Sequence, residues 1–310
     1  MALKPYATLS IIVTAHNCEP YLGKTLSSIE SACGDTFYLQ EVIIVNDSST
    51  DRTGEIVATF SSLRANVKTY DVNFKNIGKV RNFALSKCSG QYITMIDGDD
   101  EVLAGSLKDI AGYLGACQPD IHLSPLNELY DDQDKKFIWQ GVKACKLTQD
   151  NVIKKFLTHK NLQAHFIGQF FSRKFLEKIS FPEFICYEDA WTFPLLLNLS
   201  TVISYSASSH YLYHKRKGSL SEQVTPEKIS LLIAATEQMV VNFGKRYIPL
   251  ISCHWINILH KYEKEIEATE DINKVKNSIR QVSLLHFLFH PLVRLSFKKK
   301  LIRLKLAGKV

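Results

Sequence analysis

Runs of apolar residues alternate with helically spaced positions along the first hundred residues. The apolar runs have about the length of a strand and are rich in β-branched residues; they cover 9–13, 41–46, 67–71 and 92–96. The stretches between them place apolar side chains three or four residues apart, as in Leu22, Leu26 and Ile29, which predicts helices. Apolar strands separated by helices are typical of a parallel sheet covered on both faces. We therefore predict an α/β fold here.

The pattern changes further along the chain. Residues 106–225 are mixed, with one helix predicted over 106–115, and the spacing becomes helical throughout after Pro226. At 310 residues the chain is long enough for one large domain and a smaller appendage. We expect a domain of residues 1–225, made of the halves 1–105 and 106–225, and a helical region of residues 226–310.

Polar side chains follow three of the predicted strands, at the point where each strand ends. They are Thr14, His16 and Asn17 after the first strand, Asn46 and Asp47 after the second, and Asp97, Asp99 and Asp100 after the fourth. Ligands of open parallel sheets bind outside the carboxyl ends of the strands. The pattern therefore predicts a ligand site at this edge of the sheet.

The run Asp97-Gly98-Asp99-Asp100 places three carboxylates within four residues. Hard divalent cations prefer oxygen ligands and leave positions open for substrate phosphates, and a cation also relieves the repulsion between neighbouring carboxylates. A solvated acidic turn that opens a helix is the alternative, because Asp is also a good helix cap. The run alone does not decide between these two interpretations.

Four blocks of the sequence resemble the family 2 glycosyltransferases, in the order and spacing of that family. The blocks are 10–22, 41–53, 76–93 and 97–100. The resemblance covers roughly residues 8–225. It implies the GT-A fold, a Rossmann-like domain that binds a nucleotide-diphospho-sugar, and transfer with inversion at the anomeric carbon.

The resemblance also implies roles for single residues. Thr14, His16 and Asn17 would lie in the nucleotide site, with Thr14 and His16 next to the base, and Asp47 would bind the base. The family usually has Tyr at the position of His16 and Asp at the position of Asn46, so this sequence departs from it twice. The local alternatives are a strand-end histidine at 16 and a helix cap at 47.

The diphosphate and the metal would be held by the next two blocks. The resemblance implies that Asp99 binds Mn²⁺ or Mg²⁺, with Asp97 beside it near the ribose and diphosphate, and that Arg81 faces the diphosphate. The alternative for Arg81 is an ordinary arginine on a helix surface.

A second acidic site, Glu188-Asp189, lies in the mixed region. Inverting transfer needs a base that takes the proton of the acceptor hydroxyl. The pair resembles the acceptor-side motif of the family, which implies that Asp189 is the base and Glu188 supports it. Two acids that stabilise the start of a helix through its dipole are the alternative.

The segment 211–221 resembles a Tyr-Arg-x-x-x-x-Ser segment of the family. His214 stands where the family has Arg, and it could complete the metal shell or donate to the diphosphate. Arg216 and Ser219 are further diphosphate candidates, because basic groups stabilise the leaving diphosphate. A solvated basic turn is the alternative.

The net charge of +7 is concentrated in the tail, where seven basic residues and no acidic residue follow His290. Helical geometry places Val293, Phe297, Leu301 and Leu304 on one face, while a second apolar strip contains Leu292, Leu295, Ile302 and Leu306. We interpret the tail as an interfacial helix on an anionic membrane. A helix packed on the rest of the protein is the alternative, and nucleic acid is not expected as a partner.

The remaining composition indicates a cytoplasmic protein on the inner face of the plasma membrane. The seven cysteines are scattered without a CxxC pair, which argues against a disulfide framework and a structural zinc site. The apolar run 9–13 is too short for a signal peptide, and no stretch reaches the roughly 20 apolar residues of a membrane span.

We therefore expect a metal-dependent inverting glycosyltransferase. It would move a sugar, from a UDP-sugar in the first instance, to a hydroxyl of a glycan or lipid-linked saccharide in bacterial lipopolysaccharide or capsule synthesis. A non-catalytic, membrane-bound protein that binds nucleotide-sugars on the same scaffold is the alternative. A nucleotidyltransferase is disfavoured, because residues 14–21 lack a Gly-rich phosphate loop with a lysine.

Overall fold

The computed structural model describes residues 6–130, 135–162, 165–216 and 224–310. Within these residues, eight strands form one sheet in the order β3-β2-β1-β4-β9-β6-β10-β8, and three strands form a smaller sheet in the order β5-β11-β7. The strands of the large sheet are β1 (Leu9–Ala15), β2 (Glu41–Asp47), β3 (Val67–Val72), β4 (Tyr92–Asp97), β6 (Ile121–Leu123), β8 (Ala144–Leu147), β9 (Phe170–Ser172) and β10 (Ile203–Ser206). The strands of the small sheet are β5 (Glu101–Val102), β7 (Leu126–Tyr130) and β11 (Tyr211–Lys215).

The first half of the large sheet is parallel, as predicted. Strand β1 lies between β2 and β4 and is parallel to both, and β3 closes this edge as a parallel strand. The second half is mixed, because β9 runs antiparallel between β4 and β6. The predicted strands 9–13, 41–46, 67–71 and 92–96 each lie within one observed strand.

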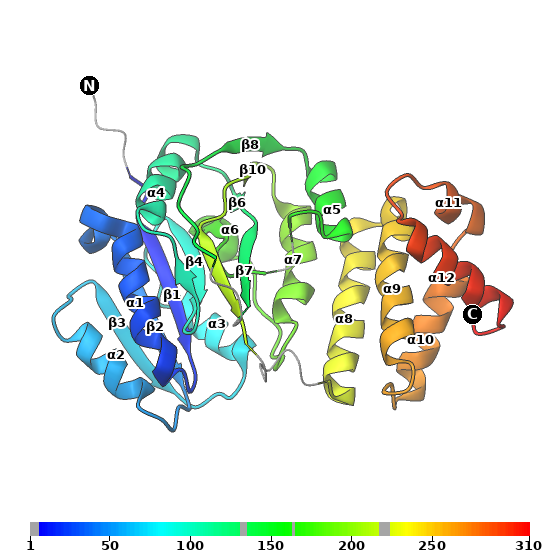
Figure 1. The fold of residues 1–310 in the computed structure, drawn as a ribbon, viewed down its shortest axis with the longest axis horizontal. Helices are drawn as coiled ribbons and strands as arrows, with labels where there is room; N and C mark the ends of the chain where they lie inside the picture. Colours follow the sequence, from blue (N-terminus) through cyan, green and yellow to red (C-terminus); the bar gives the residue numbers. More distant parts are fainter. Residues whose placement is uncertain (1–5, 131–134, 163–164, 217–223) are drawn as a thin grey trace.

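Helices cover both faces of this sheet (Figure 1). They are α1 (Glu19–Cys33), α2 (Thr53–Ser61), α3 (Ile77–Leu85), α4 (Ser106–Cys117), α5 (Gln149–Thr158), α6 (Arg173–Leu176) and α7 (Glu188–Leu199). The side chains of β1 divide between two cores: Ile11 packs in a cluster with α1 and α4, while Ile12 packs in a cluster with α3, α5 and α7. Because both faces are buried, these strands need the continuous apolar runs seen in the sequence.

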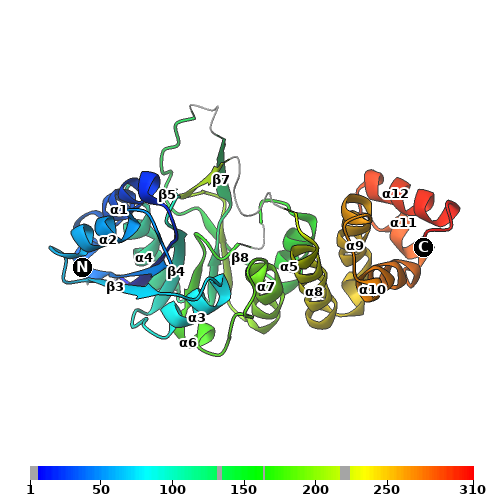
Figure 2. The ribbon, with the colours of Figure 1, turned by 90° about the horizontal axis from the view of Figure 1, so that it is seen from below.

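The chain becomes helical from Pro226, where the pattern predicts it. The helices are α8 (Pro226–Phe243), α9 (Ile248–Tyr262), α10 (Thr269–Arg280), α11 (Leu284–Phe289) and α12 (Leu295–Leu306). Figure 2 shows them as an extension at one end of the α/β part, with α8 next to α7. Phe156 of α5 stacks on Phe193 of α7 at 5.6 Å and meets Phe243 of α8 edge-on at 5.8 Å. The hydrophobic core therefore continues across residue 225, and the division into domains there stays a prediction.

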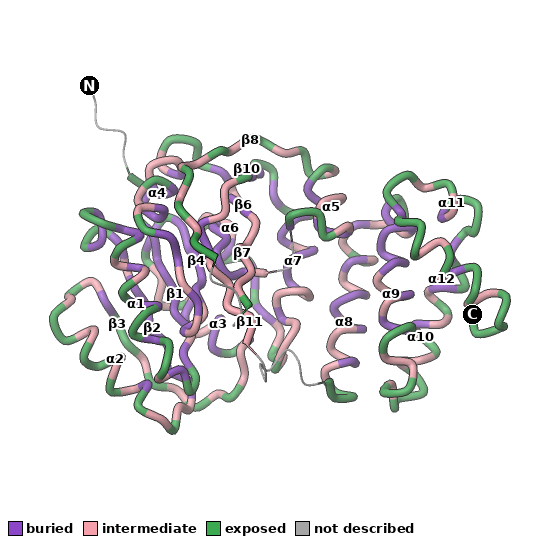
Figure 3. The backbone as a smooth tube through the Cα atoms, viewed as in Figure 1, coloured by how far each residue is buried: buried purple, intermediate pink, exposed green. Residues whose placement is uncertain are grey.

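The two apolar strips of the tail have different environments. Val293 and Leu301 are buried, and Phe297 and Leu304 pack against the same core, so the first strip is the face that holds α12 on the helical region. The second strip is exposed, with Leu295 67% and Leu306 83% exposed. Figure 3 shows exposed stretches along α12. The first strip therefore fits the alternative interpretation, a helix packed on the rest of the protein. The second strip is not covered by other described residues of the chain.

No helix within the described part of the chain combines the length and the apolar character needed to cross a bilayer.

Candidate active site

The carboxyl ends of β1, β2 and β4 meet at one edge of the sheet and bring the predicted polar residues together. Thr14 of β1 pairs in register with Asp97 of β4, and its hydroxyl donates a hydrogen bond of 3.0 Å to Asp97 Oδ1. On the other side of β1, Ala15 pairs in register with Asn46 of β2. The parallel register therefore places the ends of all three strands at one site.

His16 and Asn17 link the ends of β1 and β2. The Nδ1 atom of His16 lies 2.6 Å from the carbonyl oxygen of Asp47, and its Nε2 lies 3.2 Å from Asn17 Nδ2. Asn17 adopts a left-handed backbone with φ of 46°, and its side-chain oxygen accepts a hydrogen bond from the backbone N–H of Thr50. Both residues are exposed at the rim of the site.

Asp47 is buried and organises the loop after β3. Its Oδ1 accepts hydrogen bonds from the backbone N–H groups of Phe74 at 2.7 Å and Lys75 at 3.1 Å. Helix α2 begins at Thr53 and its N-cap is Arg52, so Asp47 does not cap this helix. Asn46 Nδ2 donates a hydrogen bond of 2.7 Å to the Asp71 carboxylate, which an ionised Asp at position 46 could not donate.

The three carboxylates of the run 97–100 have three different environments. Burial raises the pKa of Asp97, the charge of Asp99 raises it further, and Arg81 opposes the shift. Asp100 is fully buried and accepts hydrogen bonds from the Tyr211 hydroxyl at 2.7 Å and the backbone N–H of His214 at 2.8 Å. Burial, followed by the charge of Asp97, raises the pKa of Asp100 to about 8. Asp100 therefore joins β4 to β11 rather than facing a ligand.

Gly98 allows this run to turn tightly against β1. A Cβ atom at this position would lie 2.9 Å from Cys18 Sγ and 2.9 Å from the carbonyl oxygen of Thr14. The backbone N–H of Gly98 donates to that same carbonyl, and its own carbonyl accepts from Thr25 Oγ1. The turn that carries Asp97 and Asp99 is thus fixed by contacts that only glycine permits.

Arg216 forms an ion pair with Asp99, the predicted metal ligand. Its Nη1 lies 2.6 Å from Asp99 Oδ2, its Nη2 lies 2.6 Å from the Asp99 carbonyl oxygen, and its guanidinium stacks 3.9 Å from the ring centre of Tyr21. The Asp99 side chain remains 43% exposed. An arginine from the segment after β11 therefore neutralises the carboxylate in this state.

His214 lies close to the run but is engaged elsewhere. Its Nε2 is 2.8 Å from Glu101 Oε1, and the Lys24 ammonium contacts the same oxygen at 2.8 Å. Across the residues that the structure describes, no group of three or more His, Cys, Asp or Glu side chains is assembled as a metal cluster. Ser219, the third predicted residue of this segment, lies outside the described residues.

The environment of Asp97 and Asp99 nevertheless suits a divalent cation. Asp97 carries a raised pKa because its charge is poorly solvated and lies near the charge of Asp99, and a cation would relieve both effects. Both side chains offer hard oxygen ligands, whereas the His214 ring is held by Glu101. The donor set that fits the metal is therefore Asp99 with Asp97.

Arg81 is buried, so the alternative of a surface arginine is wrong. Its Nη1 lies 2.5 Å from Glu188 Oε1, and its guanidinium lies 5.9 Å from the ring centre of Phe166 and 5.6 Å from that of Phe181, two rings that contact each other edge-on. Within the described residues, its buried Nε has no hydrogen-bond partner. A buried cation with an unused donor is well suited to an anionic ligand.

Glu188 and Asp189 open helix α7 beside this arginine. Tyr187 adopts a left-handed backbone with φ of 64°, which turns the chain into the helix. Burial raises the pKa of Glu188 to about 7, against the opposing effect of Arg81. Asp189 is less buried, and its Oδ2 lies 3.5 Å from His165 Nδ1. Glu188 is thus the buried partner of Arg81, and Asp189 is the more accessible carboxylate of the two.

Sequence reasoning missed two residues that position these groups. Asn82 holds the segment before α7, since its amide donates to the Phe181 carbonyl at 2.9 Å and accepts from the Phe181 N–H at 2.8 Å. In the sequence, the only indication of a role for Asn82 is its position next to Arg81 in one of the four blocks. His165 had no local signal, because it lies in an irregular stretch before β9.

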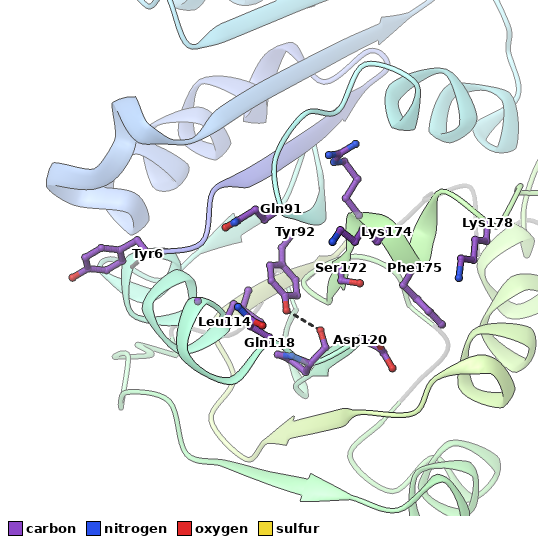
Figure 4. A pocket seen from close by; sticks show the side chains of 13 residues that line it. Tyr6, Gln91, Tyr92, Leu114, Gln118, Asp120, Ser172, Lys174, Phe175 and Lys178 are labelled. Carbon is purple, nitrogen blue, oxygen red and sulfur yellow. Dashed lines mark hydrogen bonds between the residues drawn. The ribbon is translucent and has the colours of Figure 1, made fainter. Parts of the chain in front are cut away.

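A cavity of about 460 Å³ lies away from this site. Figure 4 shows it around Tyr92, the first residue of β4, whose hydroxyl donates to the Pro119 carbonyl at 2.8 Å. It is therefore at the amino end of the parallel strands, opposite the edge that gathers the carboxylates. A second cavity, of about 370 Å³, includes His165 in its lining and so borders the Asp189 side.

The fold and the gathered residues define a class of protein. Residues 10–178, more than half of the chain, match the family described as Glycosyl transferase family 2, and the chain belongs to this family.

Individual relatives can then be named. The chain is 25% identical over 250 residues to glycosyltransferase GlyA of Streptococcus pneumoniae, an alignment that covers 78% of this chain and 35% of that protein. The chain thus spans about a third of the length of the first curated relatives it matches.

Two solved structures share the fold. TarS 1–349 of S. aureus in complex with UDP-GlcNAc has a TM-score of 0.68 at 20% identity, covering 97% of this chain and 92% of that one. Mannosyltransferase PcManGT of Pyrobaculum calidifontis, in complex with GDP-Man and Mn²⁺, has a TM-score of 0.56 at 14% identity, covering 99% and 89%. The predicted GT-A fold with a helical C-terminal region is confirmed.

Proposed function

We propose that this protein transfers a sugar from a nucleotide-diphospho-sugar to a hydroxyl group of an acceptor, with inversion at the anomeric carbon. The observation that carries the proposal is the buried ion pair between Arg81 and Glu188. It joins the nucleotide-binding half of the sheet to the start of α7, so that a diphosphate-facing cation and the accessible carboxylate Asp189 belong to one site.

The chemistry divides between two sides of that site. On the acceptor side, Asp189 takes the proton of the acceptor hydroxyl as its oxygen attacks the anomeric carbon. On the donor side, the bond from that carbon to the diphosphate breaks and negative charge develops on the leaving nucleoside diphosphate. Arg81, with its unused buried donor, stabilises this charge where it forms.

Asp99 and Asp97 would hold the divalent cation, which when bound supplies further positive charge to the diphosphate. Arg216 now neutralises Asp99, so it must leave the carboxylate before a cation can bind there. Once released, Arg216 lies next to the same diphosphate and can donate to it. His214 supports the site from its bond to Glu101 instead of serving as a ligand.

The donor and acceptor are proposed from the relatives. The solved structure of TarS contains UDP-GlcNAc, which favours a UDP-sugar as the first donor to test. TarS is described as a poly(ribitol-phosphate) β-N-acetylglucosaminyltransferase, and another relative as a glucosyltransferase that acts on a saccharide linked to undecaprenol diphosphate. These descriptions support a role in bacterial surface glycan synthesis, with a glycan or lipid-linked saccharide as acceptor.

A peripheral membrane location on the cytoplasmic face would fit such an acceptor. Leu295, Ile302 and Leu306 form an exposed apolar strip on α12, with Lys299 and Arg303 next to it by helical spacing. Apolar side chains flanked by basic residues are typical of helices that bind anionic bilayers. The strip that contacts the membrane in this proposal is the exposed one, since the other strip is buried.

Thermal unfolding with a panel of UDP- and GDP-sugars tests the proposal. A UDP-sugar with Mn²⁺ should raise the unfolding temperature more than either component alone, and slow metal-dependent release of UDP should accompany it. A non-catalytic binding protein would show the stabilisation without the release. Absence of stabilisation by every donor in the panel would contradict the proposal.

A further inference from the structure

A polar cavity of about 370 Å³ is lined in part by His165, which contacts the proposed base Asp189. Its volume falls in the range of small-molecule sites, roughly 300–1,000 Å³. We propose that this cavity is the acceptor subsite and that it takes an uncharged sugar ring. The proposal rests on the transferase function proposed above and adds the substrate class to it.

The position of the cavity comes from two of its walls. His165 lies in one wall, and its Nδ1 is 3.5 Å from Asp189 Oδ2. Glu128 of β7 lies in another wall and pairs at 3.0 Å with Lys215 of β11, the strand that also carries His214. The cavity therefore lies between the base and the small sheet that borders Asp99 and Asp100. His165 is the lining residue that connects the cavity to Asp189.

The lining carries groups that suit sugar hydroxyls. Asn127 and Asn161 both line the cavity, and within the described residues neither side-chain amide makes a hydrogen bond. An amide offers two donors and an oxygen with two acceptor sites, which matches hydroxyl groups that both donate and accept. Phe137, which is half-buried in the same lining, offers an apolar surface for the C–H face of a ring.

The charge of the lining selects against phosphate. Among the described residues, the lining contains no lysine or arginine, and its ionisable side chains are Glu128, His159 and His165. Burial lowers the pKa of His159, which keeps that ring neutral. Lys215, which pairs with Glu128, is not itself a lining residue. A phosphate group in this cavity would be desolvated near the Glu128 carboxylate without a lysine or arginine in the lining to pair with it, which is costly. A neutral saccharide meets no such penalty.

Saccharide binding to the full chain can be measured by saturation-transfer NMR in the presence of UDP and Mn²⁺. The probes are methyl β-glucoside, methyl β-N-acetylglucosaminide and, as an anionic probe, glycerol phosphate. Asn127→Ala and Phe137→Ala should each weaken binding of the better glycoside by about fivefold, the effect of losing one hydrogen bond or contact of about 1 kcal/mol. Lys174→Ala, an exposed residue of the opposite cavity, is the matched control and should bind normally.

Hydrolysis of the donor, in which the sugar is transferred to water and UDP is released, separates this inference from the proposed function. Both cavity variants should hydrolyse the donor within about twofold of the parent rate, because water needs no sugar subsite. Unchanged glycoside binding in both variants, no glycoside binding to the parent, or preferential binding of glycerol phosphate would each overturn the inference. If the parent protein itself did not hydrolyse the donor, that result would instead contradict the transferase function.

Discussion

At the scale of single residues, the site is organised by charge compensation between distant segments. Arg81 is paired with Glu188, Arg216 with Asp99, and His214 with Glu101. Removing one partner of a buried pair is costly because the other charge is left without compensation. Asp189 differs from these groups, since it is partly exposed and its neighbour is His165. It can therefore be replaced without leaving a buried cation unpaired.

Asp189→Asn should lower the rate of sugar transfer to a saccharide or to water, measured as UDP release, by at least about a hundredfold, the usual effect of losing a general base. Donor affinity, measured by titration calorimetry, should change by less than about twofold, since Arg81 and the strand ends are untouched. Glu183→Gln is the matched control, because Glu183 is an exposed acid in the same segment that pairs with Lys79. Normal turnover in the Asp189 variant would show that another group is the base.

His122 of β6 provides a test of pH dependence at a buried histidine that takes no part in the proposed chemistry. Its Nδ1 lies 3.0 Å from the Ser204 hydroxyl, and burial lowers its pKa from 6.5 to about 4. The unfolded chain therefore binds a proton at this residue below pH 6.5 that the folded protein does not bind until about pH 4. The contribution of His122 to the free energy of unfolding is therefore fully present above pH 6.5 and is lost as the pH falls towards 4.

His122→Gln should remove that dependence. Between pH 6.5 and 4, the free energy of unfolding of the parent should fall more steeply than that of the variant by about 1.4 kcal/mol per pH unit, the value for one proton. Urea denaturation at a series of pH values measures both slopes. His260→Gln, at an exposed position of α9, is the control. Equal slopes for the parent and His122→Gln would contradict the role assigned to burial.

At the scale of elements, the turn between β4 and β5 decides where the carboxylates lie. Strand periodicity places the end of β4 correctly, but it does not reveal how closely the turn approaches β1. That approach depends on Gly98, whose backbone bonds to Thr14 and Thr25 leave no room for a side chain. The ligand geometry is thus set by contact between elements.

Gly98→Ala should destabilise the protein by about 1–3 kcal/mol, because the added methyl group overpacks the turn. UDP affinity should fall as well, since Asp97 and Asp99 move with the turn. Gly23→Ala in α1 is the matched control: nothing lies within 4 Å of the added Cβ, and alanine should stabilise the helix by up to about 1 kcal/mol. Urea denaturation and UDP titration measure both effects. A Gly98 variant as stable as the parent would show that the turn can relax.

At the scale of the whole molecule, the two faces of the tail helix α12 lie in different environments. One apolar strip of α12 packs into the core that runs from the sheet through α8 and α9, and the other strip is exposed together with basic side chains. Anionic lipids contribute about 1 kcal/mol for each basic residue near the surface. The exposed strip is therefore the surface through which a membrane would be bound.

Replacing Leu295, Ile302 and Leu306 together by Ser should reduce partition onto phosphatidylglycerol vesicles by at least about tenfold, because the inserted apolar surface is lost. The fold should be unaffected, since all three side chains are exposed. The control replaces Leu39, Leu63 and Val241 by Ser, which are exposed apolar residues outside the tail. Vesicle sedimentation gives the comparison, and equal partition of the two triple variants would contradict membrane binding through α12.

The sequence by itself determined the α/β class, the strands at 9–13, 41–46, 67–71 and 92–96, and the start of the helical region at Pro226, because these depend on local periodicity. It also determined that polar residues follow the strand ends, since parallel strands end at a common edge. The four family blocks were recognisable for the same reason: each is a continuous stretch of chain.

Only the tertiary structure decided which side chains meet. The pairs of Arg216 with Asp99 and His165 with Asp189 join residues from separate elements, and sheet order and packing, rather than spacing along the chain, bring them together. The same holds for the tail, where both apolar strips fit a helix equally well. The core of the helical region accepts Leu301 and leaves Leu306 in solvent, because only one face of α12 can lie against α9.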